Sequence, residues 1–495
     1  MKARIEVDLG HPIGAVDPLI YGQFLSRRRW VADGGLHDPK HPDAGSDGIR
    51  RQVRDRIARL RPSVIRWPGG CTGTSYWWEA GIGPAQARPR TVDWHFGYDV
   101  ANDFGTVEFV DFCRSVGAEP HLNFNTATAS LRNALDWVEY VNGTGSSPNA
   151  ELRRRHGRAD PLNVRYWQIG NEDWGEWEIG QCSADENAVR AREWAKAIKR
   201  IDDGLKLIAV GCWRPEESVE WNAAVLDQAW DQVDYLAVHT YWRFSGRMGE
   251  AEYDRIVAAG FIEEDGIRAL GGLVDLVARQ KGTARRPRLA FTEWNCADTD
   301  LRGMSAAWRP EAPQFRLMDA LAVAGFLNAM QRQCRLVGLA NFAQTINVVG
   351  ALFVDQDHVV PETVYWPLLM QRENSGPISV PAHVECDGYL LHDHRHLGAV
   401  PYLDASATHD ERGRRAWISV VNRSRDDEMV TDVVLRDRSP KPAATVIQLA
   451  ADDPLAQNTP DSPDAVLPRT ERVTVDGDLS LSLPPHSYTI VALEY

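Results

Sequence analysis

The sequence predicts an α/β fold, a (β/α)8 barrel of the TIM type with a C-terminal β-sandwich domain. At 495 residues the chain is longer than one hydrophobic core usually supports. Short β-rich apolar runs alternate with longer segments of helical periodicity up to about residue 370, and short alternating runs replace them beyond it. We therefore expect a barrel over residues 18–370 and a sandwich over residues 371–495 that also takes residues 1–17.

The barrel region contains eight candidate strands and seven candidate helices between them, which is the count of a (β/α)8 barrel. The strands are expected at residues 19–25, 63–67, 119–124, 164–169, 205–210, 233–239, 288–292 and 336–343. Amphipathic helices are expected at residues 49–60, 106–116, 131–141, 185–201, 217–230, 265–280 and 314–332. This architecture places functional residues at the carboxyl ends of the strands.

The sandwich is expected from short runs of alternating polar and apolar residues, separated by turn residues and prolines. Clear examples are residues 415–422, 431–435 and 487–493. Residues 2–9 alternate in the same way, so the two ends of the chain are expected to share this smaller domain.

Charge and composition indicate which kinds of molecule the protein can bind. The formal net charge is -14 and the pI is near 5.5, which disfavours nucleic acid and anionic membrane surfaces and suits a neutral ligand. The N-terminus lacks the apolar segment of a secretory signal, and no stretch approaches the ~18 apolar residues of a membrane span. We expect a cytoplasmic protein with no membrane partner.

The seven cysteines are scattered and include no C-x-x-C pair. This spacing argues against a disulfide framework and against a zinc site, so reduced thiols and no metal are expected. Eighteen tryptophans are more unusual, because all but Trp417 precede residue 370 and several, including Trp174, lie beside expected strand ends. Such rings suit the apolar faces of sugars, although each one serves equally well as core filler.

Two expected strands each run into a glutamate. Residues 164–169 lead to Glu172, and residues 288–292 lead to Glu293. An ionisable residue at the end of an apolar strand contributes nothing to the core, so both glutamates are expected to face a cleft. Two facing carboxyl groups are the acid and the nucleophile that a retaining glycosidase needs. The acid has to stay protonated near neutrality, and an apolar, tryptophan-rich surround together with the second carboxylate is expected to raise its pKa.

Other polar residues also follow expected strand ends. A barrel built only for stability has no use for such a ring, which comprises Arg66, Asn171, Glu172, His239, Tyr241, Glu293 and Gln344. Tyr241 and Arg66 are suited to hydrogen-bonding Glu293, and Asn171 to holding a sugar hydroxyl beside the reacting carbon.

Several motifs along nearly the whole chain resemble those of glycoside hydrolase family 51, the α-L-arabinofuranosidases. They are Arg66-Trp-Pro-Gly-Gly-Cys71, Trp78-Glu-Ala-Gly-Ile-Gly-Pro84, Phe104-Gly-Thr106, Trp137-Val-Glu-Tyr140, Tyr166-Trp-Gln-Ile-Gly-Asn-Glu-Asp-Trp174, Glu293-Trp-Asn295, Ala343-Gln-Thr-Ile-Asn-Val348 and Leu483-Pro-Pro-His-Ser487.

The resemblance implies a retaining mechanism in which Glu172 is the acid/base and Glu293 the nucleophile. It also implies that a bound sugar is lined by Arg66, Cys71, Asn171, Tyr241 and Gln344. It implies no metal or organic cofactor, and an intracellular homo-oligomer that is often a hexamer.

One departure concerns the first strand. The family carries Tyr-Gly-x-Phe-x-Glu-His there, whereas this chain reads Tyr21-Gly-Gln-Phe-Leu-Ser26-Arg27. Losing a charged acceptor for a sugar hydroxyl typically costs about 1.5 to 3 kcal/mol. We therefore expect Ser26 to mark an altered sugar subsite, with Arg27 or its neighbours supplying new donors.

Three functions are compatible with these residues. The first is an exo-acting arabinofuranosidase-like enzyme. The second is another retaining glycosidase on the same scaffold, such as a galactofuranosidase, a xylosidase or an endo-glucanase. The third is a carbohydrate-binding pseudoenzyme, which the presence of both glutamates disfavours because a binding module gains nothing from two close carboxylates.

Two further motifs are ambiguous. Alternating histidines in His392-Asp-His394-Arg-His396 would lie on one side of a strand, but they are far from the expected cleft, so a surface or inter-domain role is expected. The run Arg153-Arg-Arg155-His156 is expected to be a solvated loop.

Overall fold

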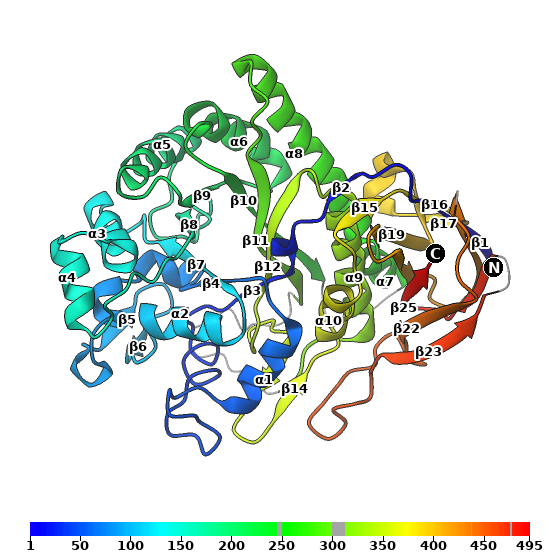
Figure 1. Cartoon of the computed structure of the whole chain (residues 1–495), viewed down its shortest axis with the longest axis horizontal. Helices are drawn as coiled ribbons and strands as arrows, with labels where there is room; N and C mark the ends of the chain where they lie inside the picture. The colour runs from blue at the N-terminus through cyan, green and yellow to red at the C-terminus, as the bar shows by residue number, and fades with distance from the viewer. Residues whose placement is uncertain (245–249, 299–311, 437, 476–477) are drawn as a thin grey trace.

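The computed structural model describes residues 1–244, 250–298, 312–436, 438–475 and 478–495. Eight parallel strands close into a barrel, shown on the left of Figure 1 with helices around it. In chain order they are β3 (Gly22–Phe24), β4 (Val64–Trp67), β7 (Glu119–Phe124), β8 (Tyr166–Ile169), β9 (Lys206–Val210), β10 (Tyr235–Phe244), β11 (Arg288–Asp298) and β12 (Val337–Ala343). All eight expected strands are therefore confirmed.

The strand ends differ from expectation at two places. Residues 18–21 form a short 3-10 helix, η1 (Pro18–Tyr21), because Asp17 accepts a hydrogen bond from the backbone N–H of Leu19 and Pro18 stands at the first helical position. Strands β10 and β11 run five or six residues further than expected and pair with each other throughout their length. Glu293 consequently lies within β11 rather than at its end.

All seven expected helices are present. They are α1 (Arg51–Leu60), α2 (Thr106–Ser115), α3 (Leu131–Asn142), α5 (Ala184–Ile201), α6 (Pro215–Ala229), α8 (Ala259–Lys281) and α9 (Leu317–Arg332). Three more helices were not expected, namely α4 (Pro148–Arg155), α7 (Glu250–Val257) and α10 (Tyr365–Glu373). No helix in the described part of the chain is long and apolar enough to cross a membrane.

The arginine run at residues 153–155 is not a solvated loop, as expected, but the last turn of α4. Arg153 is completely buried, and its guanidinium donates to the carbonyl oxygens of Tyr140 and Gly143 at 3.0 and 2.8 Å. These carbonyls lie at the end of α3 and just beyond it, where helical partners are lacking. A buried arginine on the unexpected helix α4 thus caps the end of the expected helix α3.

The sandwich consists of two sheets, which Figure 1 shows on the right together with both chain termini. One sheet has the order β16 (Ala382–Glu385), β1 (Lys2–Asp8), β21 (Met429–Arg436) and β24 (Leu479–Leu483). The other has the order β2 (Gly14–Ala15), β15 (Ile378–Val380), β19 (Leu403–Asp410), β20 (Arg415–Asn422), β25 (Ser487–Glu494), β22 (Ala443–Leu449) and β23 (Arg469–Thr474). Strand β1 pairs with β16 and β21, so the N-terminal strand joins the sandwich as expected.

The remaining elements are short, and some of them contribute to the barrel core through Trp78, Leu352 and Val354. They are β5 (Thr91–Asp93), β6 (Tyr98–Val100), β13 (Leu352–Val354), β14 (Val359–Pro361), β17 (Gly388–Leu390), β18 (Ala399–Pro401), η2 (Cys71–Ser75), η3 (Trp78–Gly81), η4 (Ala85–Ala87) and η5 (His392–Leu397). The three histidines of residues 392–396 lie in η5, not on a strand, and none of them is buried. Their imidazoles therefore do not share the face of a strand.

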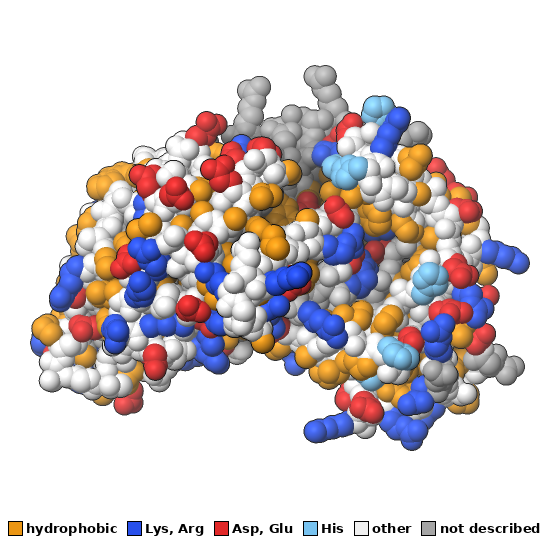
Figure 2. All heavy atoms as spheres, turned by 90° about the horizontal axis from the view of Figure 1, so that it is seen from above, with side chains coloured by type: hydrophobic (Ala, Val, Ile, Leu, Met, Phe, Trp, Pro, Cys, Tyr) orange, Lys and Arg blue, Asp and Glu red, His pale blue; other side chains and the backbone are white. Residues whose placement is uncertain are grey.

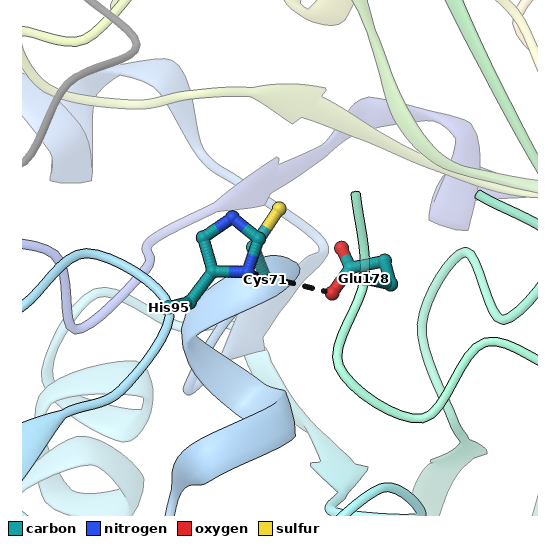
Figure 3. Close-up of side chains that lie close together, drawn as sticks. All are labelled: Cys71, His95 and Glu178. Carbon is teal, nitrogen blue, oxygen red and sulfur yellow. Dashed lines mark ion pairs between the residues drawn. The ribbon is translucent and has the colours of Figure 1, made fainter. Parts of the chain in front are cut away.

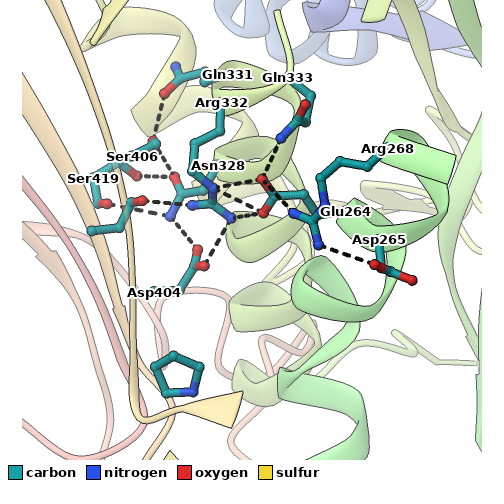
Figure 4. A network of polar contacts seen from close by, with 12 residues as sticks. Glu264, Asp265, Arg268, Asn328, Gln331, Arg332, Gln333, Asp404, Ser406 and Ser419 are labelled. Atoms are coloured by element: carbon teal, nitrogen blue, oxygen red, sulfur yellow. Dashed lines mark hydrogen bonds and ion pairs between the residues drawn. The ribbon is translucent and has the colours of Figure 1, made fainter. Parts of the chain in front are cut away.

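A buried polar network joins the barrel to the sandwich (Figure 4). The guanidinium of Arg332 on α9 donates to Glu264 on α8 at 2.6 Å and to Asp404 on β19 at 3.1 Å. Asn328 adds a hydrogen bond to Asp404 at 2.8 Å. Both carboxylates are nearly inaccessible to water, so their desolvation is offset by the Arg332 cation that they share, together with Arg423 beside Asp404 and Arg268 beside Glu264.

The face of the molecule in Figure 2 is mixed in charge, with hydrophobic side chains between the charged ones. Figure 2 shows the two domains as two lobes on which acidic and basic side chains are interspersed. All seven cysteines are free thiols, and four of them are buried.

Candidate active site

Glu172 and Glu293 meet at the mouth of the barrel. Glu172 lies two residues beyond Gly170, which follows β8, and Glu293 lies in the outer half of β11. One carboxylate oxygen of each, together with a ring nitrogen of His239, lies within 4.8 Å of the other two atoms. The pairing of β11 with β12 is irregular between Phe291 and Trp294, and such an irregularity redirects side chains toward a site.

Two hydrogen bonds hold the carboxylate of Glu293. Nη1 of Arg66 donates to Oε1 at 2.7 Å, and the hydroxyl of Tyr241 donates to Oε2 at 2.6 Å. Burial, together with the negative charge of Glu293, raises the pKa of Tyr241 well above its ordinary value, so this hydroxyl stays protonated. The expected partnership of Tyr241 and Arg66 with this glutamate is confirmed.

Gly70 makes this approach sterically possible. A Cβ at Gly70 would lie 2.5 Å from Oε1 of Glu293, closer than any non-bonded contact allows. The second glycine in the motif at residues 66–71 thus leaves room for the carboxylate.

Glu172 is held by two different donors. Nδ1 of His239 lies 2.8 Å from Oε1, and the indole N–H of Trp177 donates to Oε2 at 3.0 Å. The other ring nitrogen of His239 lies 2.8 Å from Oγ1 of Thr292, which fixes the orientation of the imidazole. Glu172 has a φ of 48°, a left-handed conformation that costs a residue with a Cβ about 1 to 2 kcal/mol and that is common at functional sites.

The pKa of Glu172 is shifted in the opposite direction to that expected. Burial alone would raise it, but the hydrogen bond and charge of His239 and the hydrogen bond from Trp177 outweigh burial and lower the pKa. The expectation of a raised pKa is therefore wrong for the enzyme without substrate. Hydrogen bonds to the ionised form decide this pKa, and the sequence does not reveal them.

Asn171 connects the two glutamates to a third carboxyl group. Its Oδ1 accepts from Nη2 of Arg66 at 2.6 Å, and its Nδ2 donates to Oε1 of Glu178 at 3.0 Å. Burial, followed by the charge of Glu172, raises the pKa of Glu178 to about 9. Glu178 is therefore a neutral acid at neutral pH.

The separation of the glutamates determines what the site can do. Retaining glycosidases hold their two carboxyl groups roughly 5 to 5.5 Å apart, whereas inverting enzymes need roughly 6.5 to 9.5 Å to admit a water molecule. Oxygens within 4.8 Å of each other match the retaining arrangement.

Comparisons with known proteins agree with this chemistry. The family model described as "Alpha-L-arabinofuranosidase 1 domain" matches residues 56–255, and the model described as "Alpha-L-arabinofuranosidase C-terminal domain" matches residues 292–487. The chain is 32% identical over 503 residues to alpha-L-arabinofuranosidase C of Emericella nidulans, an alignment that covers 97% of this chain and 96% of that protein.

The chain belongs to glycoside hydrolase family 51, the α-L-arabinofuranosidases. It is thus a glycoside hydrolase. A second relative, the intracellular exo-alpha-(1->5)-L-arabinofuranosidase of Halalkalibacterium halodurans, is 30% identical over 87% of this chain and 86% of its own length. The alpha-L-arabinofuranosidase of Thermotoga maritima, solved as an arabinose complex, superposes with a TM-score of 0.89 at 32% identity and complete coverage of both chains.

Three residues expected in the sugar subsite of this family 51 enzyme follow barrel strands β3, β4 and β12. The backbone N–H of Ser26 donates to Oε1 of Gln344 at 3.1 Å, and both residues are buried. Cys71 begins η2, one residue after Gly70. The hydroxyl of Ser26 accepts from the backbone N–H of Arg28 at 3.3 Å, so its role in the described structure is to stabilise the following turn.

Arg27 and Trp174, which were also expected to contact the sugar, form hydrogen bonds with other protein groups. The guanidinium of Arg27 donates to Oδ1 of Asn102 at 2.9 Å and lies 4.7 Å from the centroid of the Tyr76 ring. Only 5% of Arg27 is exposed, so this geometry gives no support to a contact with the sugar. Trp174 is also buried, and its indole donates to the carbonyl of Gly211 at 3.0 Å.

The analysis of the sequence missed three residues of the site, namely Trp177, His95 and Glu178. Trp177 is 43% exposed, packs edge-on against Trp174 and donates to Glu172, so it is the aromatic side chain at the open cleft. Its position five residues after a candidate glutamate was the only available signal. His95 and Glu178 lie in loops, and only the folded chain brings them together.

Proposed function

We propose that this enzyme removes terminal α-L-arabinofuranosyl groups by a double displacement that retains the anomeric configuration. The close approach of Glu172 and Glu293 carries the proposal. The names of the relatives in family 51 support the sugar, because several are described as α-L-arabinofuranosidases.

In the first step an oxygen of Glu293 attacks the anomeric carbon, and the bond from that carbon to the leaving oxygen breaks. Arg66 and Tyr241 hold the attacking carboxylate in one orientation and bind the same oxygens in the ester that forms. Asn171, which Arg66 fixes, then hydrogen-bonds the sugar hydroxyl beside the reacting carbon.

The leaving oxygen takes its proton from Glu172. The 2.8 Å contact between Glu172 and His239 orients this carboxyl group. When the aglycone displaces water from the cleft, the ionised form of Glu172 loses solvation, so the carboxyl group can hold the proton that it donates. In the second step Glu172 accepts a proton from water, which attacks the anomeric carbon and releases Glu293.

Replacing the nucleophile tests this assignment. Glu293→Ala should lower kcat by at least about 10⁴-fold, since loss of a nucleophile removes the covalent route. External azide should partly restore the rate and give a glycosyl azide of inverted configuration. Glu220→Ala is the control, because Glu220 is exposed on α6 and should leave the rate unchanged. An unchanged rate in the Glu293 variant would move the nucleophile elsewhere.

Ser26 favours a second candidate sugar. The family glutamate at this position is absent, so a furanoside that differs from arabinofuranose around the exocyclic carbon is a candidate substrate. The comparison is between nitrophenyl α-L-arabinofuranoside and the corresponding galactofuranoside and xyloside. A strong preference for the arabinoside would reject the altered subsite, and comparable or better turnover of the galactofuranoside would support it.

We also propose that the enzyme acts in the cytoplasm, which agrees with the word intracellular in the name of the Halalkalibacterium halodurans relative. Its substrate is a carbohydrate bearing a terminal furanoside. The homo-oligomer that the family resemblance implies remains a prediction.

A further inference from the structure

The turn that carries Asn171 and Glu172 has a strained backbone. Gly170 has a φ of 94° and Glu172 has a φ of 48°, so both residues lie in the left-handed region. A residue with a side chain keeps such a conformation only where its surroundings enforce it. The contacts that enforce it at Glu172 are therefore candidates for a role in catalysis, although they do not touch the substrate.

The side chain of Asp173 makes one of these contacts. Its Oδ1 accepts a hydrogen bond from the backbone N–H of Asn171 at 3.1 Å. The carboxylate also packs against Gly170, where a Cβ would lie 2.5 Å from Oδ2. Asp173 is buried, so water does not compete for its hydrogen bonds. The residue that follows Glu172 thus binds the residue that precedes it, which holds the turn closed.

Two other elements fix the Asp173 carboxylate in place. Nη1 of Arg190 on α5 donates to Oδ2 at 3.1 Å, and this ion pair is shielded because the two side chains are 22% and 4% exposed. The hydroxyl of Thr126, two residues beyond β7, donates to the same oxygen at 3.5 Å. Hydrogen bonds between charged groups are stronger than neutral ones. One carboxylate therefore ties the turn to a helix and to the end of the neighbouring strand.

The Asp173 carboxyl group is largely ionised at pH 7. Burial raises its pKa to about 6, while the charge of Arg190 and the hydrogen bond from Asn171 limit the rise. Two other titratable groups face it, namely Glu178 and Cys182, and burial raises their pKa values to about 9 and about 11. Both are neutral at pH 7, so Arg190 is the charged partner of Asp173 in this part of the described structure.

The side chain of Asn171 is fixed from a different direction. Its amide group is hydrogen-bonded to Arg66 at 2.6 Å and to Glu178 at 3.0 Å. Glu178 lies beside His95, whose Nδ1 is 3.8 Å from its Oε2 (Figure 3). Because Glu172 is the residue with the strained backbone, loosening the turn should disturb Glu172 more than the amide of Asn171.

We propose that Asp173 and Arg190 are positioning residues that hold the carboxyl group of Glu172 at the leaving oxygen, an inference that rests on the proposed role of Glu172 as acid/base. Asp173 acts through the backbone of the turn, and Arg190 acts through Asp173. A displacement of a catalytic group by about 1 Å can cost about 10²-fold in rate.

The loss should depend on the leaving group. Dinitrophenolate leaves without a proton, whereas phenolate needs the proton that Glu172 donates. A displaced Glu172 therefore slows the cleavage of phenyl α-L-arabinofuranoside far more than that of the dinitrophenyl glycoside. Glu172 is also the base of the second step, so kcat and KM for the dinitrophenyl substrate should fall together. A merely structural defect would lower kcat for both substrates alike and leave KM unchanged.

Steady-state kinetics of these two substrates at pH 7 test the proposal. Asp173→Ala should lower kcat/KM about 10²-fold for the phenyl substrate and less than about 5-fold for the dinitrophenyl substrate. Asp173→Asn keeps an oxygen for the N–H of Asn171 but loses the ion pair, and Arg190→Gln loses it from the other side. Each should lower kcat/KM about 10-fold for the phenyl substrate alone. Asp275→Asn, which breaks an exposed ion pair with Arg286, is the matched control and should behave as wild type.

The reference variant is Glu172→Ala, which removes the acid/base itself and should show the strongest dependence on the leaving group. If it does and the Asp173 and Arg190 variants lose both activities equally, or lose neither, the positioning role is wrong while the proposed function stands. If Glu172→Ala shows no such dependence, the acid/base assignment is wrong and this inference fails with it. Should Asp173→Ala not fold, as judged by circular dichroism, Asp173→Asn and Arg190→Gln decide by the same criterion.

Discussion

Replacing Glu178 by glutamine should stabilise the protein. Folding raises the pKa of this carboxyl group from its ordinary value of 4.5 to about 9, so between these pH values the folded state holds a proton that the unfolded state has lost. Stability then falls as pH rises, by about 1.4 kcal/mol per pH unit, and the accumulated cost at pH 7 is about 3 kcal/mol. Glutamine is uncharged in both states and keeps an oxygen for the Asn171 donor.

The measurement is the free energy of unfolding in urea, followed by tryptophan fluorescence. Glu178→Gln should exceed wild type by about 2 to 3 kcal/mol at pH 7 and by less than about 1 kcal/mol at pH 5, where little of the linkage has accumulated. Glu220→Gln, on the exposed face of α6, should match wild type at both pH values. A gain that is equal at pH 5 and pH 7 would refute the linkage argument, as would a loss of stability at pH 7.

Three further predictions concern other contacts. Trp177→Phe removes the indole donor that lowers the pKa of Glu172, so the basic limb of the kcat/KM profile should move to higher pH; an unshifted limb would contradict this role. Gly70→Ala places a Cβ 2.5 Å from Glu293 and should lower kcat about 10²-fold while circular dichroism shows an intact fold; a wild-type kcat would contradict the steric argument. Arg332→Ala removes the cation shared by two buried carboxylates, leaving Asp404 paired only with Arg423 and Glu264 only with Arg268, and should lower the free energy of unfolding by about 3 kcal/mol in urea; a loss below about 1 kcal/mol would show that the remaining guanidinium groups replace it.

The barrel and its two glutamates were accessible from the sequence because both depend on local patterns. Each buried strand is a short run of apolar residues. A polar residue at the end of such a run adds little to the core, so a functional role is the simplest explanation for it. The partners of Glu293 were predictable for the same reason, since Arg66 and Tyr241 also lie at or just beyond expected strand ends.

The remaining parts of the site depend on loop conformation. Loops leave no periodic pattern of apolar residues in the sequence from which their conformation could be predicted. Cys71, His95 and Glu178 are separated by 24 and 83 residues, so no short motif in the sequence connects them. The pKa of Glu172 was expected in the wrong direction because burial is visible in a sequence whereas the hydrogen bonds from His239 and Trp177 are not. Arg27 was assigned to the sugar from its position in the chain, but its side chain reaches Asn102 instead.

The most direct test of the account is the configuration of the sugar when it first leaves the enzyme. Two carboxylates this close leave no room for a water molecule opposite the leaving group, so proton NMR of an α-L-arabinofuranoside digest should show the α-anomer of arabinose first, with the β-anomer appearing only through mutarotation. If the β-anomer appears first, hydrolysis inverts the anomeric carbon, and Glu293 is not the nucleophile.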